Sequence, residues 1–174
     1  RQGAATSVSV TADDNLLPLL ETVVEPSGGG TRLVVRWKPD TSLTTRSKPL
    51  VQVVTPRLTV LAVTGSGDAR VEAFTTPSLR LALSGSGDAA LAGLKTESCE
   101  IALSGSGDVR ADGEAKRLKV RIAGSGDVAA RDLRADEVSV SIAGSGDAAV
   151  QAQRKLNVAI AGSVDVTYRG DAEV

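Results

Sequence analysis

The stretch Cys-Glu-Ile-Ala-Leu-Ser-Gly-Ser-Gly-Asp at residues 99–108 ends in four residues that recur along the chain. Successive copies end at Asp residues that lie 20, 20, 19, 20 and 18 positions apart. A fixed period of this length is the mark of a protein built from stacked structural repeats. Gly-Ser-Gly-Asp stands at 65–68, 85–88, 105–108, 124–127 and 144–147, and Gly-Ser-Val-Asp stands at 162–165.

Each copy is preceded by an alternation of apolar and other residues. Apolar side chains stand nine, seven and five positions before the Asp, and a period of two is typical of a β-strand with one buried face. A shorter alternation follows each Asp, at one and three positions on. We therefore expect two strands around one corner in each repeat. The preceding runs include Leu79-Leu81-Leu83, Cys99-Ile101-Leu103, Leu118-Val120-Ile122, Val138-Val140-Ile142 and Leu156-Val158-Ile160.

The repeat could form antiparallel hairpins or a solenoid whose coils stack in parallel. Hairpins would place different repeat positions opposite one another, whereas a solenoid stacks like on like at about 4.8 Å and so favours identical residues at the corner. The sequence predicts an all-β fold, a parallel β-helix or β-solenoid of about six coils, rising roughly 29 Å by that spacing.

We expect a single β-solenoid domain over residues 1–174, in which 57–174 form the coils. Residues 1–56 lack the repeat, but 7–10 and 32–37 have the composition of strands separated by Pro and Gly turns. An open solenoid end exposes strand edges and core, so we interpret 1–56 as an atypical N-terminal cap. Trp37 is interpreted as a lid on the first coil.

Composition excludes several functions. The 174 residues are 41% apolar, with 20 Lys and Arg against 21 Asp and Glu and no run of like charge. This balance disfavours nucleic acid and anionic membranes as partners, and no stretch is apolar enough for membrane insertion. The chain begins at Arg1 and has no Met, so we expect a processed chain or a trimmed piece of a longer one. Three aromatic residues predict a thin core.

The repeated corner has a structural and a chemical interpretation. Gly allows positive φ, while Ser and Asp hydrogen-bond nearby backbone amides in turns, and we favour this structural role. Alternatively, a column of carboxylates could hold Ca²⁺, although calcium-binding β-rolls have a nine-residue period. We expect no cofactor. The metal candidates under the alternative are Asp68, Asp88, Asp108, Asp127 and Asp147, and Asp165 stands in the same column.

Catalysis finds little support. Parallel β-helices also include polysaccharide hydrolases and lyases, which need carboxylates or a basic residue in a local site. This chain has no His, and its single cysteine, Cys99, stands at an inward strand position where a small buried hydrophobe is expected. The corner Asp residues recur once in every repeat, whereas a catalytic site would be expected to interrupt the repeat at one place.

One predicted outward surface, formed by the residues six and four positions before each Asp, carries mostly short side chains. Solvent-facing β surfaces usually carry long charged residues that discourage sheet-to-sheet contact. A flat surface of small residues allows close backbone approach, either by another copy of the chain or by an extended partner; it could equally be a plain surface or be covered by the N-terminal segment. We name it the Ala/Ser face and assign to it Ala62, Ala82, Ser84, Ala102, Ser104, Ala123, Ser141 and Ala143.

The repeated corners, Thr-Ala-Asp-Asp-Asn-Leu-Leu at 11–17, the run into the first corner at 53–68 and the closing segment 166–174 resemble the auto-transporter adhesin family, head GIN domain. The resemblance spans nearly the whole chain, and the corner repeats are its most specific part; Val164 departs from them. It implies a right-handed parallel β-helix in a secreted, periplasmic or outer-membrane-associated bacterial protein.

The family defines no ligand site that could be transferred to this sequence. We therefore expect a non-catalytic surface, adhesion-type or scaffold module, with a homo-oligomer, a cell-surface protein or a glycan as partner. The alternatives are a carbohydrate-active β-helix enzyme and a calcium-dependent β-solenoid binding domain.

Overall fold

The computed structural model describes residues 1–28, 30–39 and 48–174. The chain divides into two compact units. One unit comprises Arg1–Ala4 with Thr55–Val174, and the other comprises Ala5–Val54. No helix in the described ranges is long and apolar enough to cross a membrane.

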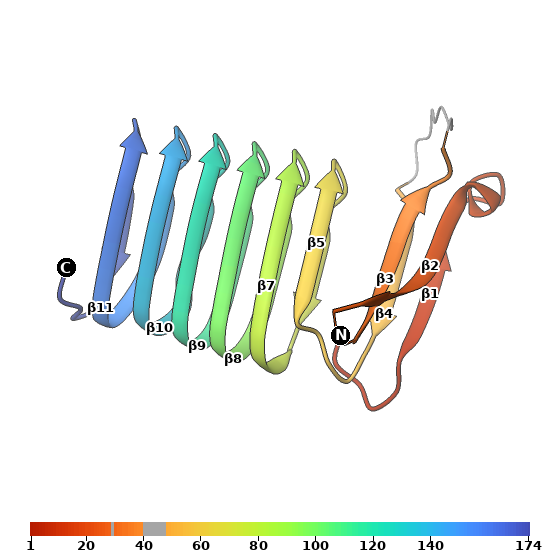
Figure 1. Cartoon of the computed structure of the whole chain (residues 1–174), viewed down its shortest axis with the longest axis horizontal. Helices are drawn as coiled ribbons and strands as arrows, with labels where there is room; N and C mark the ends of the chain where they lie inside the picture. Colours follow the sequence, from red (N-terminus) through yellow and green to blue (C-terminus); the bar gives the residue numbers. More distant parts are fainter. Residues whose placement is uncertain (29, 40–47) are drawn as a thin grey trace. The chain divides into compact units, whose positions relative to one another are not determined.

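The larger unit is a parallel β-solenoid of six coils, which confirms the predicted fold (Figure 1). Neighbouring coils pair the same repeat positions, so that Gly65, Gly85 and Gly105 stack in one column. Like-on-like stacking arises because the period of the sequence equals the length of one coil. The strands are β5 (Val60–Gly65), β6 (Ala69–Glu72), β7 (Thr75–Gly85), β8 (Ala89–Gly105), β9 (Val109–Gly124), β10 (Val128–Gly144), β11 (Ala148–Gly162) and β12 (Val166–Arg169).

The interior coils differ from the expected two separate strands. From β8 to β11, one long strand runs from each Asp corner to the next Gly corner. The strand changes direction where its register with the neighbouring coil shifts, for example between Leu91 and Leu94 and between Ala129 and Asp132. An irregularity in pairing bends a strand without ending it, which explains why the two expected strands are continuous.

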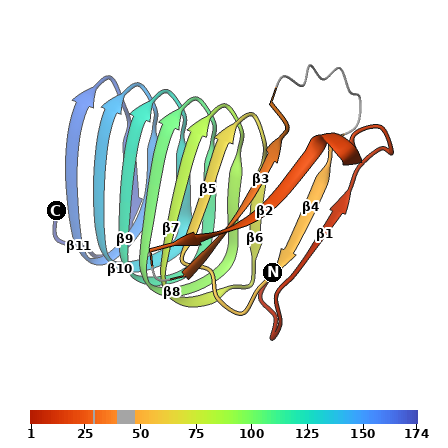
Figure 2. The same cartoon turned by 45° about the vertical axis from the view of Figure 1, so that its right-hand side comes forward.

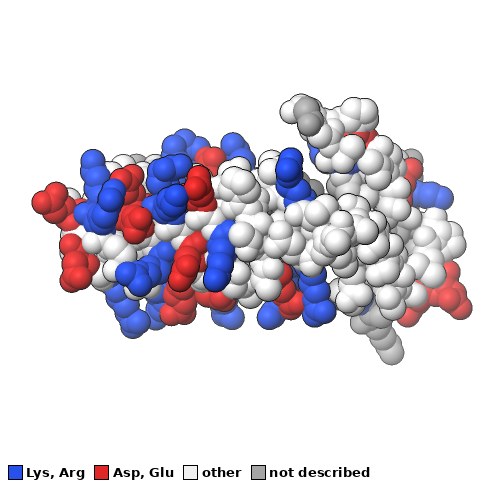
Figure 3. Space-filling model, turned by 90° about the horizontal axis from the view of Figure 1, so that it is seen from below, with Lys and Arg blue, Asp and Glu red and all other residues white. Residues whose placement is uncertain are grey.

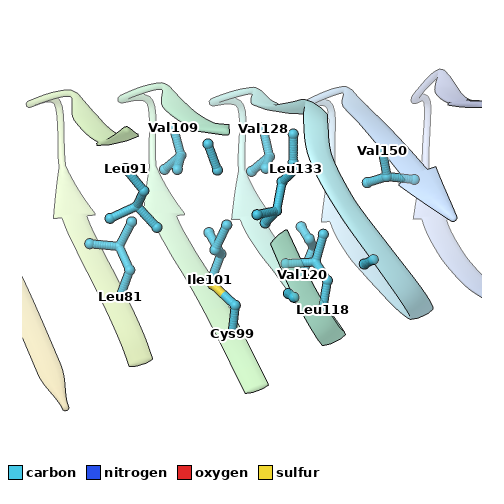
Figure 4. Packing of buried hydrophobic residues seen from close by; sticks show 14 of the residues in the cluster. Leu81, Leu91, Cys99, Ile101, Val109, Leu118, Val120, Val128, Leu133 and Val150 are labelled. Carbon is cyan, nitrogen blue, oxygen red and sulfur yellow. The ribbon is translucent and has the colours of Figure 1, made fainter. Parts of the chain in front are cut away.

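The core is a set of stacked apolar columns inside the coils (Figure 4). Leu81, Ile101 and Val120 occupy the same repeat position in three successive coils and are each 0% exposed. Phe74 is the one aromatic residue in the buried cluster of the described chain. The interior is therefore filled by aliphatic side chains, as the low aromatic content predicts.

The smaller unit is built from antiparallel pairs. The pairing of β1 (Ser7–Thr11) with β4 (Leu50–Val54) and of β2 (Leu20–Ser27) with β3 (Gly30–Trp37) forms two small sheets. Both strands predicted near the N-terminus are present, but β2 and β4 were not predicted.

A one-turn 3-10 helix, Leu17–Leu19, precedes β2. Trp37 at the end of β3 pairs with Leu20 at the start of β2. Its role as a lid on the first coil stays a prediction, as does the capping role of 1–56. Of the predicted turn, Gly29 lies outside the described residues. Figure 2 shows the coils and these strands from a second direction.

Candidate functional site

The two glycines of each corner meet different sets of constraints. Gly105 has φ of 133°, a conformation that side chains other than glycine rarely adopt. At Gly107 the limit is space, because a Cβ there would lie 1.9 Å from the backbone oxygen of Gly87 in the preceding coil. Positive φ and close stacking both require the first glycine, since a Cβ at Gly105 would lie 2.2 Å from the oxygen of Gly85, whereas close stacking alone accounts for the second.

The corner aspartates form a ladder of hydrogen bonds from coil to coil. The backbone N–H of Asp108 donates to Oδ1 of Asp88 at 2.9 Å, and the N–H of Asp127 donates to Oδ1 of Asp108 at 3.1 Å. Among the described residues, no corner serine hydroxyl makes such a bond. The expected amide partner is therefore present, but it comes from the next coil. The ladder continues through Asp68, Asp147 and Asp165.

This ladder gives the carboxylates a structural role without a cation. Within the described ranges, no group of three or more Asp, Glu, His or Cys side chains is placed to hold a metal ion. The structural interpretation of the corner has direct support from the hydrogen bonds, whereas calcium binding by the column stays an untested hypothesis.

Cys99 lies in the core, where the strand alternation places it. The side chain is 1% exposed, and burial raises the pKa of the thiol to about 12. A thiol with such a pKa stays protonated at neutral pH, whereas nucleophilic attack and metal binding both need the thiolate. The geometry fits a small apolar core residue.

The Ala/Ser face is outward and in register. Ala82 pairs with Ala102 and Ser84 pairs with Ser104 in adjacent coils, so the short side chains form two columns along β7 to β11. Arg121 interrupts one column, and its guanidinium pairs with Glu100. The other members of the face, Ala62, Ala123, Ser141 and Ala143, lie in the same two columns and are exposed.

The bend opposite the corners carries charges whose sign changes from coil to coil (Figure 3). Lys116 Nζ donates to Glu97 Oε1 at 2.8 Å across one coil boundary, which lowers the pKa of that carboxyl. Arg154 pairs with Glu137 at 2.9 Å across another. Like-on-like stacking would bring equal charges together, so the alternation replaces repulsion with attraction.

A shallow groove of about 330 Å³ runs across this charged region. It follows two outward columns, eight and ten positions before each Asp. The groove was not predicted from the sequence, although its charged residues recur at intervals of one repeat length. The lining residues are Ser98, Arg117, Leu118, Lys119, Glu137, Val138, Ser139, Lys155 and Asn157.

Solved structures share the fold. A "putative adhesin" from Bacteroides fragilis is 20% identical with a TM-score of 0.78, over 98% of this chain and 84% of that one. A "putative lipid binding protein" from Parabacteroides distasonis is 25% identical with a TM-score of 0.68, over 99% of this chain and 80% of the other.

A "putative adhesin" from Parabacteroides distasonis is 24% identical with a TM-score of 0.56, over 98% of this chain and 82% of that one. A comparison with curated proteins gave no match. The family model described as "Putative auto-transporter adhesin, head GIN domain" matches residues 1–172. With its repeated corners and its parallel solenoid, the chain belongs to this family of auto-transporter adhesin head domains.

Proposed function

We propose that this protein is a non-catalytic binding module of the bacterial cell surface or envelope, which works by presenting the faces of its solenoid to partners. Membership of an adhesin head family supports a binding role outside the cytoplasm, in a secreted, periplasmic or outer-membrane-associated setting. The structural role of the aspartate ladder and the burial of Cys99 support the absence of catalysis. A hydrolase or lyase site needs its carboxylates or basic residue in a local cluster, whereas the ladder repeats its carboxylates along the coils.

The observation that carries the proposal furthest is the register of the Ala/Ser face. Its short side chains repeat at the same height in successive coils, on strands that are paired on both sides from β7 to β10. A rigid, flat surface with little side-chain entropy to lose can bury area on association at low cost. We assign this face to contact with a second copy of the chain.

Sedimentation velocity of the whole chain tests this assignment. The wild-type protein is expected to associate at high micromolar concentration, and Ala82→Arg with Ala102→Arg is expected to abolish association while the circular dichroism spectrum stays unchanged. Two added arginines introduce repulsion and bulk into each facing surface. A matched control places the same residues on another wall of the solenoid, at Ala129 and Ala149, which are partly exposed. A strictly monomeric wild type would remove the contact between copies.

The enzymatic alternative is tested by incubating the protein with acidic and neutral polysaccharides. No new reducing or unsaturated sugar ends are expected. Their appearance, if lost on substitution of groove residues, would replace the proposed binding role with a catalytic one.

A further inference from the structure

We propose that the groove along the charged bend binds an anionic polysaccharide that carries an acidic group on alternate sugar residues. The inference deepens the binding role proposed above, but it uses the columns eight and ten positions before each Asp instead of the Ala/Ser face. The two assignments can therefore fail separately.

The groove contains three basic groups that are not held in short ion pairs. Arg117 and Lys119 in β9 and Lys155 in β11 are exposed, and none forms a salt bridge with another described residue. Glu137 is the one acidic residue in the lining, and its carboxylate accepts a hydrogen bond from Arg154. An excess of positive charge is therefore available to a ligand, in a chain whose net charge is −1.

The spacing of these charges follows the coils. Arg117, Glu137 and Lys155 stack at one repeat position in three successive coils. The two basic residues are therefore separated by two coil spacings, about 9.6 Å, with a carboxylate between them. In the next column, Ser139 separates Lys119 from Asn157.

This pattern selects among anionic ligands. A uniformly anionic surface, such as a membrane, would meet the acidic residues Glu97, Glu100 and Glu137 as well as the basic ones. A sugar residue in an extended chain advances by about one coil spacing, so acids on alternate residues would lie over the basic coils and neutral residues over the acidic coil. Favourable and unfavourable contacts together give such a groove its selectivity.

The remaining lining fits a carbohydrate. Ser98, Ser139 and Asn157 supply hydroxyl and amide groups that both donate and accept hydrogen bonds, as sugar hydroxyls require. Leu118 and Val138 form the floor of the groove and are themselves buried in the core. None of the lining residues is aromatic, which favours recognition through charge over stacking on a sugar ring.

Titration calorimetry of the whole chain with three oligosaccharides tests the ligand class. The probes are a hyaluronan fragment, which has one carboxylate per disaccharide, a polygalacturonate fragment, which has one per residue, and a neutral cellulose fragment. Hyaluronan is expected to bind most tightly and cellulose not at all. Binding to vesicles of phosphatidylglycerol and phosphatidylcholine is expected to be weaker than to hyaluronan. The proposal is overturned if hyaluronan does not bind, or if polygalacturonate or the vesicles bind as tightly.

Substitutions test the site. Arg117→Gln with Lys119→Gln and Lys155→Gln is expected to weaken hyaluronan binding by about tenfold or more, because three direct charge contacts are lost. The matched control, Lys95→Gln with Arg110→Gln and Arg131→Gln, removes the same net charge from exposed positions outside the groove. It is expected to change binding by less than about twofold in physiological salt. Equal losses in the two triple variants would contradict the assignment.

A variant that binds more tightly gives an independent test of the groove, because misfolding could not produce an increase in affinity. Glu137→Gln removes the carboxylate between the two basic coils. It is expected to increase the affinity for polygalacturonate more than the affinity for hyaluronan, because the repelled charge of the former lies over this position. An unchanged ratio of the two affinities would overturn the role of charge spacing.

Discussion

The interior coils and the terminal coils contain the same repeat positions but differ in what is stacked on them. In the interior, Gly107 lies so close to the preceding corner that a Cβ would overlap Gly87, whereas Gly67 in the first coil has no heavy atom within 4 Å of a Cβ. Ile142 in the fifth coil is 1% exposed, whereas Ile160, at the same position in the sixth, is 49% exposed. The same repeat position is therefore tightly enclosed in an interior coil and open in a terminal coil, because only the interior coil has neighbours stacked on both sides.

The sixth corner, at the end of the solenoid, differs in sequence from the interior corners. Val164 stands where the interior corners have their second glycine. The N–H of Ser163 reaches the oxygen of Gly144 at 3.2 Å, whereas the equivalent bond from Ser145 to Gly124 is 2.9 Å. This last corner has no further coil stacked on it, and we expect the second glycine to matter most where corners lie on both sides.

The largest effect is expected from Gly107→Val, compared with Gly67→Val. The first substitution forces the backbones of two coils apart and should lower the free energy of unfolding by more than about 4 kcal/mol, or prevent folding. Gly67→Val, in the open corner, should cost much less, as should Ser139→Val on a strand surface. Urea denaturation measures all three variants. Similar losses at both glycines would show that stacking does not select the residue.

The next largest effect concerns the core column that contains Ile142 and Ile160. Ile142→Ala should lower the free energy of unfolding by about 2 to 5 kcal/mol, because a buried side chain leaves a cavity. Ile160→Ala removes the same atoms from a half-exposed site and should cost less than about 1 kcal/mol. Chemical denaturation distinguishes them, and equal costs would mean that the sixth coil is covered in solution.

Cys99 offers a test confined to the interior coils. Between the usual thiol pKa of 9.0 and the folded value of about 12, the unfolded chain loses the proton while the folded chain keeps it. The free energy of unfolding should therefore fall by about 1.4 kcal/mol per pH unit in this window, and not below it. Cys99→Val should remove this part of the alkaline loss. Thermal melts of both proteins from pH 7 to 11 measure the difference; parallel curves would contradict the burial of the thiol.

A smaller effect is expected from the aspartate ladder. Asp108→Ala removes the acceptor for the N–H of Asp127, and at an exposed site this should cost about 1 kcal/mol. Asp165→Ala should cost less, because the described chain places no further corner amide on its carboxylate. Asp108→Asn keeps an acceptor oxygen and should recover part of the loss in urea denaturation. A loss at Asp165 as large as at Asp108 would contradict the ladder.

Much of the solenoid could be predicted from sequence because period two and the corner spacing act together. Positions such as Leu81 and Ile101 belong to one buried column, and counting from each corner identifies which residues stack. The bends were not predicted because they depend on pairing irregularities, which vary between coils. In the N-terminal unit, β2 was missed because Pro26 lies within it, near the hairpin turn, where the missing N–H is tolerated.

The candidate sites also include some that could be predicted from the sequence and one that was missed. Alternation within each strand predicted that the Ala/Ser face points outward and that Cys99 points inward. The groove depends on side chains from different coils, such as Lys119 and Lys155, and on the short Ser139 between long neighbours. The column ten positions before each Asp, which contains Arg117, Glu137 and Lys155, is the part of the groove that was not predicted.

The central claim is that backbone contacts between coils hold the Gly-Ser-Gly-Asp corners, so that recognition falls to the outward faces. Thermal melting of the whole chain with millimolar Ca²⁺, and again with a chelator, tests it most directly, because a cation bound to the folded state raises the melting temperature. The account predicts the same melting temperature in both conditions, since each Oδ1 from Asp68 to Asp147 already accepts an amide. A rise of several degrees with Ca²⁺, lost in Asp108→Ala, would contradict it and make the aspartate column a metal site.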